Sequence, residues 1–145
     1  MPTVRSKLSK KNKYYIPEHR FLELKHFCLQ YKNWQDALKS MSTMPYSMTY
    51  DRMRLSKTND IFDPTMRNVL IREFYRKRIN LVETAANLSD PLLSLWIIKG
   101  VTEGRSYDNL SMMYTIPCDR NTYYDRYRKF FYILDNLQTH GITDF

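Results

Sequence analysis

Side chains that can bind a nucleic-acid duplex are concentrated between residues 120 and 129. An Arg guanidinium matches the two acceptors on the major-groove edge of guanine, an Asn amide matches adenine, and Thr or Tyr hydroxyls bind phosphate oxygens. On a helix, these side chains gather on one side near the N-terminal end. The chemistry that they support is binding to double-stranded DNA. The predicted contact residues are Arg120, Asn121, Thr122, Tyr124, Asp125, Arg126, Arg128 and Lys129.

The other side of the same helix is apolar at three- and four-residue spacing, which predicts that it packs on a domain. These apolar residues are Tyr123, Tyr127, Phe130, Leu134 and Leu137. Asp125 is the one acid among the predicted contacts, and phosphates repel it unless it meets a cytosine amino group or orients Arg128. The alternative is an amphipathic helix that is basic without binding DNA. The helix and turn that precede it favour the DNA-binding interpretation.

Local signals place a shorter helix before this one. Ser106 is a good N-cap for a helix over 107–114. Its inward residues are predicted to be Leu110 and either Met113 or Tyr114. Pro117 ends that helix, because proline lacks the N–H and disfavours helical geometry at the residue before it. Asp119 can cap the next helix, which runs to about Leu137, so the segment follows the helix-turn-helix plan with the second helix in the major groove.

The remaining sequence predicts how the chain is organised. We expect a flexible basic arm (1–13), an N-terminal helical unit (14–42), a connector (43–62) and a helical domain (63–145) that includes the helix-turn-helix (106–137). The arm has Lys and Arg but no acid, which suits either phosphate contacts or a solubilising tail. Asp63 and Pro64 open a long helix. The helix through Leu92 is apolar almost all round, is stopped by Gly104, and is expected at the buried centre of this domain.

Composition favours an all-α fold. Only three glycines occur in 145 residues, so few turns have positive φ and a hairpin-rich β fold is disfavoured. The net charge of +8 attracts polyanions. No signal peptide is recognised, the longest apolar run (Leu92–Ile98) is too short to span a bilayer, and Cys28 and Cys118 are isolated. We therefore expect a cytoplasmic protein that does not bind membranes.

Metal binding and catalysis have little support in the sequence. His19, His26 and Cys28 are close together, but no further ligand completes a tetrahedral site. A buried Cys28 beside a surface His26 is the expected arrangement. Glycine-rich phosphate loops, nucleophile elbows and metal-binding acid clusters are not recognised. We expect no enzyme activity, no catalytic residue, no cofactor and no metal.

The C-terminal quarter also resembles a known type of regulator. The run Ser106–Ser111, the Ile116-Pro117 turn, and the Thr-Tyr-Tyr step at Thr122 with the Arg- and Lys-rich helix after it look like region 4 of sigma factors. They are still more similar to phage late-gene transcription regulators of the RinA and ArpU type. Residues 13–20 and 24–28 resemble the opening of small proteins from phages of Gram-positive hosts. The resemblance implies promoter binding that activates phage late or packaging genes in a bacterial host cell, with host RNA polymerase as a further partner.

Two functions of different classes remain open. The first is a sequence-specific transcription regulator, whose DNA binding depends steeply on salt. A homodimer is compatible with it, because one helix-turn-helix offers few base contacts. The second is a phage assembly or interaction protein, such as a small-terminase-like DNA packaging subunit or a host-factor binder. The N-terminal helices, with Trp34 expected to be exposed, would then bind the partner, and DNA affinity would be weak or absent.

Overall fold

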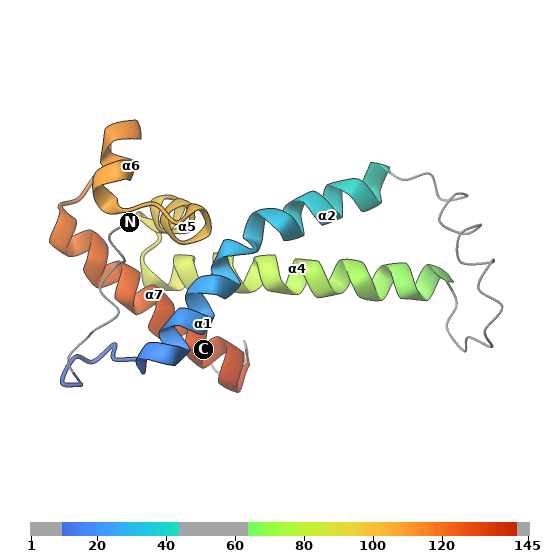
Figure 1. Cartoon of the computed structure of the whole chain (residues 1–145), viewed down its shortest axis with the longest axis horizontal. Helices are drawn as coiled ribbons and strands as arrows, with labels where there is room; N and C mark the ends of the chain where they lie inside the picture. The colour runs from blue at the N-terminus through green and yellow to red at the C-terminus, as the bar shows by residue number, and fades with distance from the viewer. Residues whose placement is uncertain (1–9, 44–63, 142–145) are drawn as a thin grey trace. The chain divides into compact units, whose positions relative to one another are not determined.

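The computed structural model describes residues 10–43 and 64–141, and these residues form helices and no strand (Figure 1). The expected all-α class is therefore confirmed for this part of the chain. The helices are α1 (Glu18–Leu29), α2 (Tyr31–Thr43), α4 (Pro64–Ser89), α5 (Ser94–Glu103), α6 (Tyr107–Met113) and α7 (Arg120–His140). None of these helices has the length and apolar character that crossing a membrane requires. The expected connector lies almost wholly outside the described residues, as do residues 1–9 of the arm.

The ends of the helices follow the local signals of the sequence. The Ser106 hydroxyl accepts a hydrogen bond from the Asn109 N–H at 3.2 Å, and the Asp119 carboxylate accepts one from the Thr122 N–H at 3.4 Å. Both expected N-caps are thus confirmed. Gly104 ends α5 with φ of 68°, a left-handed conformation that favours glycine. The expected cap of α4, Asp63, lies outside the described residues.

The described residues divide into two compact units, one formed by residues 10–31 and 80–141 and the other by residues 32–43 and 64–79. In the first unit, α7 contacts α1, α5 and α6, and α5 also contacts α1 and α6. Because three helices cover α7, it buries more than the expected apolar stripe. Its buried residues are Tyr123, Tyr124, Tyr127, Phe130, Phe131, Ile133, Leu134 and Leu137.

Helix α1 belongs to this first unit. Arg20 Nε donates to Asp135 Oδ1 at 2.7 Å, and Arg20 Nη2 donates to Gln138 Oε1 at 3.0 Å. The Phe21 and Phe131 rings pack edge to face with their centroids 4.9 Å apart. The sequence grouped residues 14–42 as one N-terminal unit, whereas these contacts attach α1 to the C-terminal helices. In Figure 1, α1 lies across the C-terminal half of α7, while α6 lies near its N-terminal end.

Several burial expectations were wrong. Leu92 is 80% exposed because it lies in the turn before α5, and Leu95 is 55% exposed because it lies on the side of α5 away from α1, α6 and α7. Met113 and Tyr114 are also exposed, since α6 is a short helix whose one buried residue is Leu110. Trp34, in the second unit, is buried rather than exposed. The pairing of a buried Cys28 with an exposed His26 is confirmed.

The second unit contains most of α2 and residues 64–79 of α4. Arg72 Nη2 donates to the Met41 carbonyl at 3.3 Å and so joins the two helices. Apolar side chains on this part of α4 stay about half exposed: Met66, Val69, Leu70 and Phe74. The Arg78 guanidinium lies 3.4 Å from the centre of the Phe74 ring. This unit therefore presents apolar and cationic groups side by side.

Candidate nucleic-acid interface

The start of α7 is fixed in place by α6 and by the turn between them. The Tyr107 hydroxyl donates to the Cys118 carbonyl at 2.7 Å, and the Tyr107 N–H donates to the Tyr124 hydroxyl at 3.1 Å. Leu110 of α6 is fully buried, and α5, α6 and α7 all contact one another. The first turns of α7 therefore belong to a packed group of three helices, α5, α6 and α7. Because the backbone of α7 is held in this way, the positions from which its exposed side chains project are fixed.

The open side of α7 carries five of the predicted contact residues. We name this set the outward sector: Asn121, Thr122, Asp125, Arg128 and Lys129. Asn121 and Thr122 are exposed in the first turn, and the other three are half-buried. Arg120 lies exposed at the rim, where its Nη1 is 3.5 Å from Asp108 Oδ2 of α6. The structure thus brings hydrogen-bonding and cationic groups together over the first turns of the helix.

Tyr124 is not on the open side. Its side chain is 8% exposed, its hydroxyl accepts the hydrogen bond from Tyr107, and its ring packs edge to face on Tyr123 and Tyr127. The predicted outward placement of Tyr124 was wrong, because α6 covers that side of α7. The Tyr124 ring also makes a cation–π contact with Arg120, whose guanidinium lies 5.8 Å from the ring centre. Tyr124 therefore supports the start of α7 instead of facing solvent.

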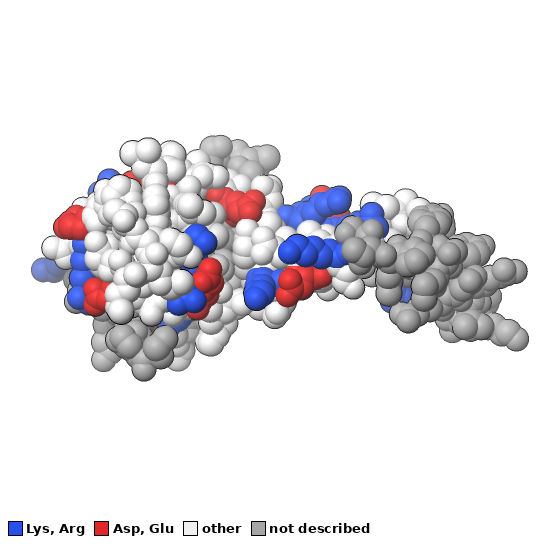
Figure 2. Space-filling view, turned by 90° about the horizontal axis from the view of Figure 1, so that it is seen from above, with Lys and Arg blue, Asp and Glu red and all other residues white. Residues whose placement is uncertain are grey.

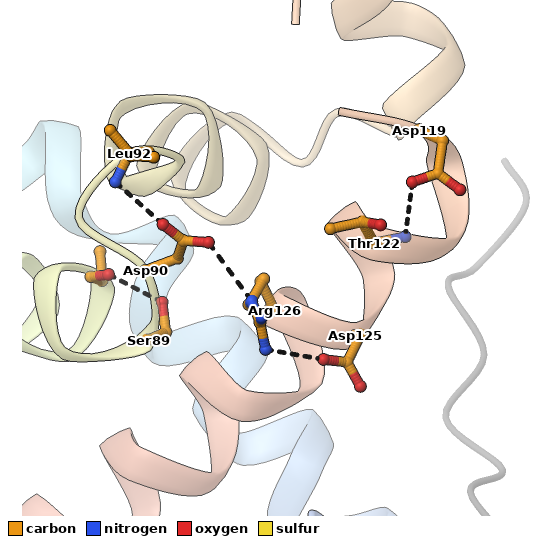
Figure 3. A network of polar contacts seen from close by, with 8 residues as sticks. Ser89, Asp90, Leu92, Asp119, Thr122, Asp125 and Arg126 are labelled. Atoms are coloured by element: carbon orange, nitrogen blue, oxygen red, sulfur yellow. Dashed lines mark hydrogen bonds and ion pairs between the residues drawn. The ribbon is translucent and has the colours of Figure 1, made fainter. Parts of the chain in front are cut away.

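Arg126 is already engaged by two carboxylates within the chain. Its Nε lies 3.3 Å from Asp90 Oδ2, and its Nη1 lies 3.0 Å from Asp125 Oδ2. Asp90 is held in turn by the Leu92 N–H, which donates to Oδ1 at 2.9 Å (Figure 3). The sequence indicated Asp90 only as part of a helix-start signal. Its contact with a residue 36 positions away had no signal in the sequence.

The N-terminal segment limits how far the open side extends. The Tyr14 ring packs on the Tyr132 ring of α7 with centroids 5.7 Å apart, and Ile16 is buried. Lys13 Nζ lies 5.0 Å from the centre of the Tyr14 ring. The outward sector is thus bounded by Tyr132 on the C-terminal side, and one cation of the expected basic arm lies next to that boundary. Residues 10–14 form a turn rather than an extended tail.

Two groups in the turn that leads into α7 have shifted pKa values. The hydrogen bond from Thr122 lowers the pKa of the Asp119 carboxyl, which therefore stays charged at neutral pH. Burial, together with Asp119 and Asp90, raises the pKa of the Cys118 thiol, so Cys118 is not an activated nucleophile. Within the described ranges, no three His, Cys, Asp or Glu side chains gather as a metal site. Figure 2 shows Lys and Arg interspersed with Asp and Glu on the face in view, so this face does not carry charge of one sign alone.

Comparison with protein-family models, curated proteins and solved structures finds no significant match to this chain.

Proposed function

We propose that this chain is a sequence-specific regulator of transcription that binds double-stranded DNA through a helix-turn-helix formed by α6 and α7. The observation that carries the proposal is the outward sector. One side of α7 is anchored on α1, α5 and α6, while its open side presents amide, hydroxyl and cationic groups near the N-terminal end. The major groove admits one α-helix, and recognition helices contact bases with their N-terminal residues. The exposed polar and cationic residues near the N-terminal end of α7 support this role.

The residues divide by the groups that they suit. Asn121 and Arg128 match adenine and guanine edges, respectively, whereas Thr122, Lys129 and Arg120 suit phosphate oxygens. Arg126 is set apart from these contacts by its pairs with Asp90 and Asp125. The net charge of +8 supplies the long-range attraction that brings the chain to DNA.

The test is a fluorescence anisotropy titration of the full chain against duplex fragments from the neighbourhood of its own gene. Each fragment is titrated at two salt concentrations with the natural chain, Arg128→Ala and Lys25→Ala. Lys25→Ala is the matched control, because it removes one positive charge from α1. We expect one fragment to be preferred, Arg128→Ala to weaken that preference and Lys25→Ala to leave it intact. Uniform binding of all fragments, or equal effects of the two variants, would contradict base readout by α7.

The regulatory role follows from the resemblance to phage late-gene regulators. The proposal includes activation of late or packaging genes at a promoter in the bacterial host cell, contact with host RNA polymerase, and a homodimer on the DNA. Transcription from the preferred fragment by purified polymerase should rise when the chain is added. A footprint with two half-sites one helical turn apart, about 34 Å, would indicate the dimer. A fall in transcription would instead make the chain a repressor.

A second candidate function is supported by the exposed apolar side chains. Leu92, Leu95 and Met112 are more than half exposed in the first unit, and Met66, Val69, Leu70 and Phe74 line α4 in the second. Exposed apolar groups of this kind are typical of protein-binding surfaces. The chain would then be a phage assembly or interaction protein, such as a small-terminase-like packaging subunit. Ring-sized particles in light scattering, together with no selective DNA binding, would favour it.

A further inference from the structure

Asp125 is the acidic member of the outward sector. Its side chain is 46% exposed, and on the helix it lies one turn after Asn121 and about one turn before Arg128. It is thus flanked on both sides by residues suited to base edges. A carboxylate at this position needs an explanation, because it faces the polyanion that the rest of the sector attracts.

A chain of contacts holds the carboxylate in place. Arg126 Nη1 donates to Asp125 Oδ2 at 3.0 Å, and Arg126 Nε donates to Asp90 Oδ2 at 3.3 Å. Asp90 is fixed by the Leu92 N–H in the turn between α4 and α5. Figure 3 shows this path from the turn through Arg126 to Asp125. Among the described residues, no group donates to Asp125 Oδ1, which stays available to a ligand.

The contact with Arg126 changes what Asp125 can do beside DNA. A lone carboxylate would be repelled by the phosphates, and the adjacent Arg126 guanidinium, which Asp125 shares with Asp90, offsets part of its charge. A carboxylate accepts hydrogen bonds and donates none. Of the base edges in the major groove, cytosine offers an amino donor with no acceptor on the same base. Adenine places its N7 acceptor beside its amino group, and that acceptor repels a carboxylate.

We propose that Asp125 is a specificity residue that accepts a hydrogen bond from the amino group of a cytosine, with Arg126 and Asp90 as its positioning residues. This inference rests on the proposed function and deepens it. It assigns Arg126 to the orientation of Asp125 and not to a phosphate. It also assigns the turn between α4 and α5 a part in base selection through Asp90.

The experiment uses the full chain and a pool of duplexes with a randomised central segment. The preferred site is selected from the pool, and every single base-pair change in that site is then titrated by anisotropy. The natural chain is compared with Asp125→Ala, Asp125→Asn, Arg126→Gln and Arg126→Lys. The matched control is Asp36→Asn, which removes one negative charge from an exposed position on α2. All variants change partly or fully exposed side chains, so each is expected to fold.

With the natural chain, replacing one cytosine of the site should weaken binding by about 5- to 150-fold. Asp125→Ala should abolish the preference at that base pair and leave the other positions unchanged. Asp125→Asn should shift the preference there towards adenine, because an amide matches both adenine groups. Arg126→Gln should reduce the preference at the same base pair only, and Arg126→Lys should restore part of it. If Asp125 and Arg126 had only a structural role, their variants would lower affinity equally at all base pairs of the site.

The outcomes separate this inference from the proposed function. Selective binding whose base preferences are the same in the natural chain and in Asp125→Ala would overturn the role of Asp125 while DNA recognition stands. A loss with Arg126→Gln that is uniform across the site would overturn the positioning role of Arg126. No selection from the pool by the natural chain would overturn both the inference and the proposed function. Asp36→Asn should match the natural chain throughout.

Discussion

Tyr123 provides the sharpest test of the packing beneath α7. Its side chain is fully buried, and its hydroxyl is the one buried side-chain polar atom without a hydrogen-bond partner among the described residues. A buried hydroxyl without a partner costs about 1–3 kcal/mol. Tyr123→Phe removes that cost. The void left by the missing oxygen lowers stability, but by a smaller amount. We therefore expect Tyr123→Phe to raise the free energy of unfolding by about 1 kcal/mol.

The measurement is urea unfolding of the full chain, followed by circular dichroism. With a denaturant slope of about 1–3 kcal/mol per molar urea, the midpoint should rise by roughly 0.3–1 M. The control is Tyr124→Phe, the same chemical change at the next residue. The Tyr124 hydroxyl accepts the Tyr107 N–H, so its removal should lower stability by about 1 kcal/mol. A loss of stability in Tyr123→Phe as large as that in Tyr124→Phe would refute the reasoning, since it would mean that the Tyr123 hydroxyl has a partner.

Gly100 extends the test to the contact between α5 and α7. A Cβ added at Gly100 would lie 2.2 Å from the Tyr123 hydroxyl oxygen, whereas the next atoms, from Arg105 and Leu110, are 3.4 Å away. Gly100→Ala should lower stability. Overpacking costs about 1–3 kcal/mol, whereas the higher helix propensity of alanine stabilises the helix by about 1 kcal/mol. In the Tyr123→Phe background the same change should be neutral or stabilising. Additive effects of the two changes would show that the hydroxyl is not the atom that Gly100 accommodates.

Two further predictions concern the helix caps of the candidate interface. Ser106→Ala removes the acceptor of the Asn109 N–H and should lower the free energy of unfolding by about 1 kcal/mol, as measured by urea unfolding, with Ser111→Ala on the exposed side of α6 as the control. The hydrogen bond from Thr122 lowers the pKa of Asp119 in the folded chain, so its contribution to stability is complete above the ordinary Asp pKa and is lost as the pH falls through the lowered value. Thermal unfolding between pH 2 and 6 should show that Asp119→Asn has a weaker acid dependence than the natural chain; equal slopes would contradict the role of the charge.

Local features of this fold could be predicted from the sequence, because short-range chemistry determines them. Ser106 and Asp119 cap helices through atoms three residues away, and Gly104 ends α5 through its own backbone freedom. Pro117 lies in the turn between α6 and α7, as its missing N–H requires. The apolar stripe of α7 follows from helical spacing alone.

Contacts between distant segments could not be predicted in this way. A helical wheel gives directions but does not say which of them a neighbour covers, so Tyr124 was placed in solvent although α6 buries it. Leu92 and Leu95 look like core residues, yet Leu92 lies in the turn before α5 and Leu95 lies on the exposed side of that helix. The pair between Arg126 and Asp90 depends on how the turn after α4 meets α7, which local chemistry does not specify. The sequence therefore indicated the residue types of the outward sector and the side of the helix on which they lie. It did not indicate the contacts that hold this part of α7 in place.

The attachment of α1 to α7 has a consequence for how the chain is made. Arg20 reaches Asp135 and Gln138 across 115 and 118 positions of sequence, and Phe21 packs on Phe131. During synthesis, α1 leaves the ribosome long before its partners exist, and its apolar side has to wait for them. The first unit can be completed only after α7 has emerged, so any activity that depends on α7 would arise after translation of this segment is finished. A nascent chain that stops before α7 would lack the Phe131 ring that packs on Phe21, and we expect it to be a substrate for chaperones and proteases.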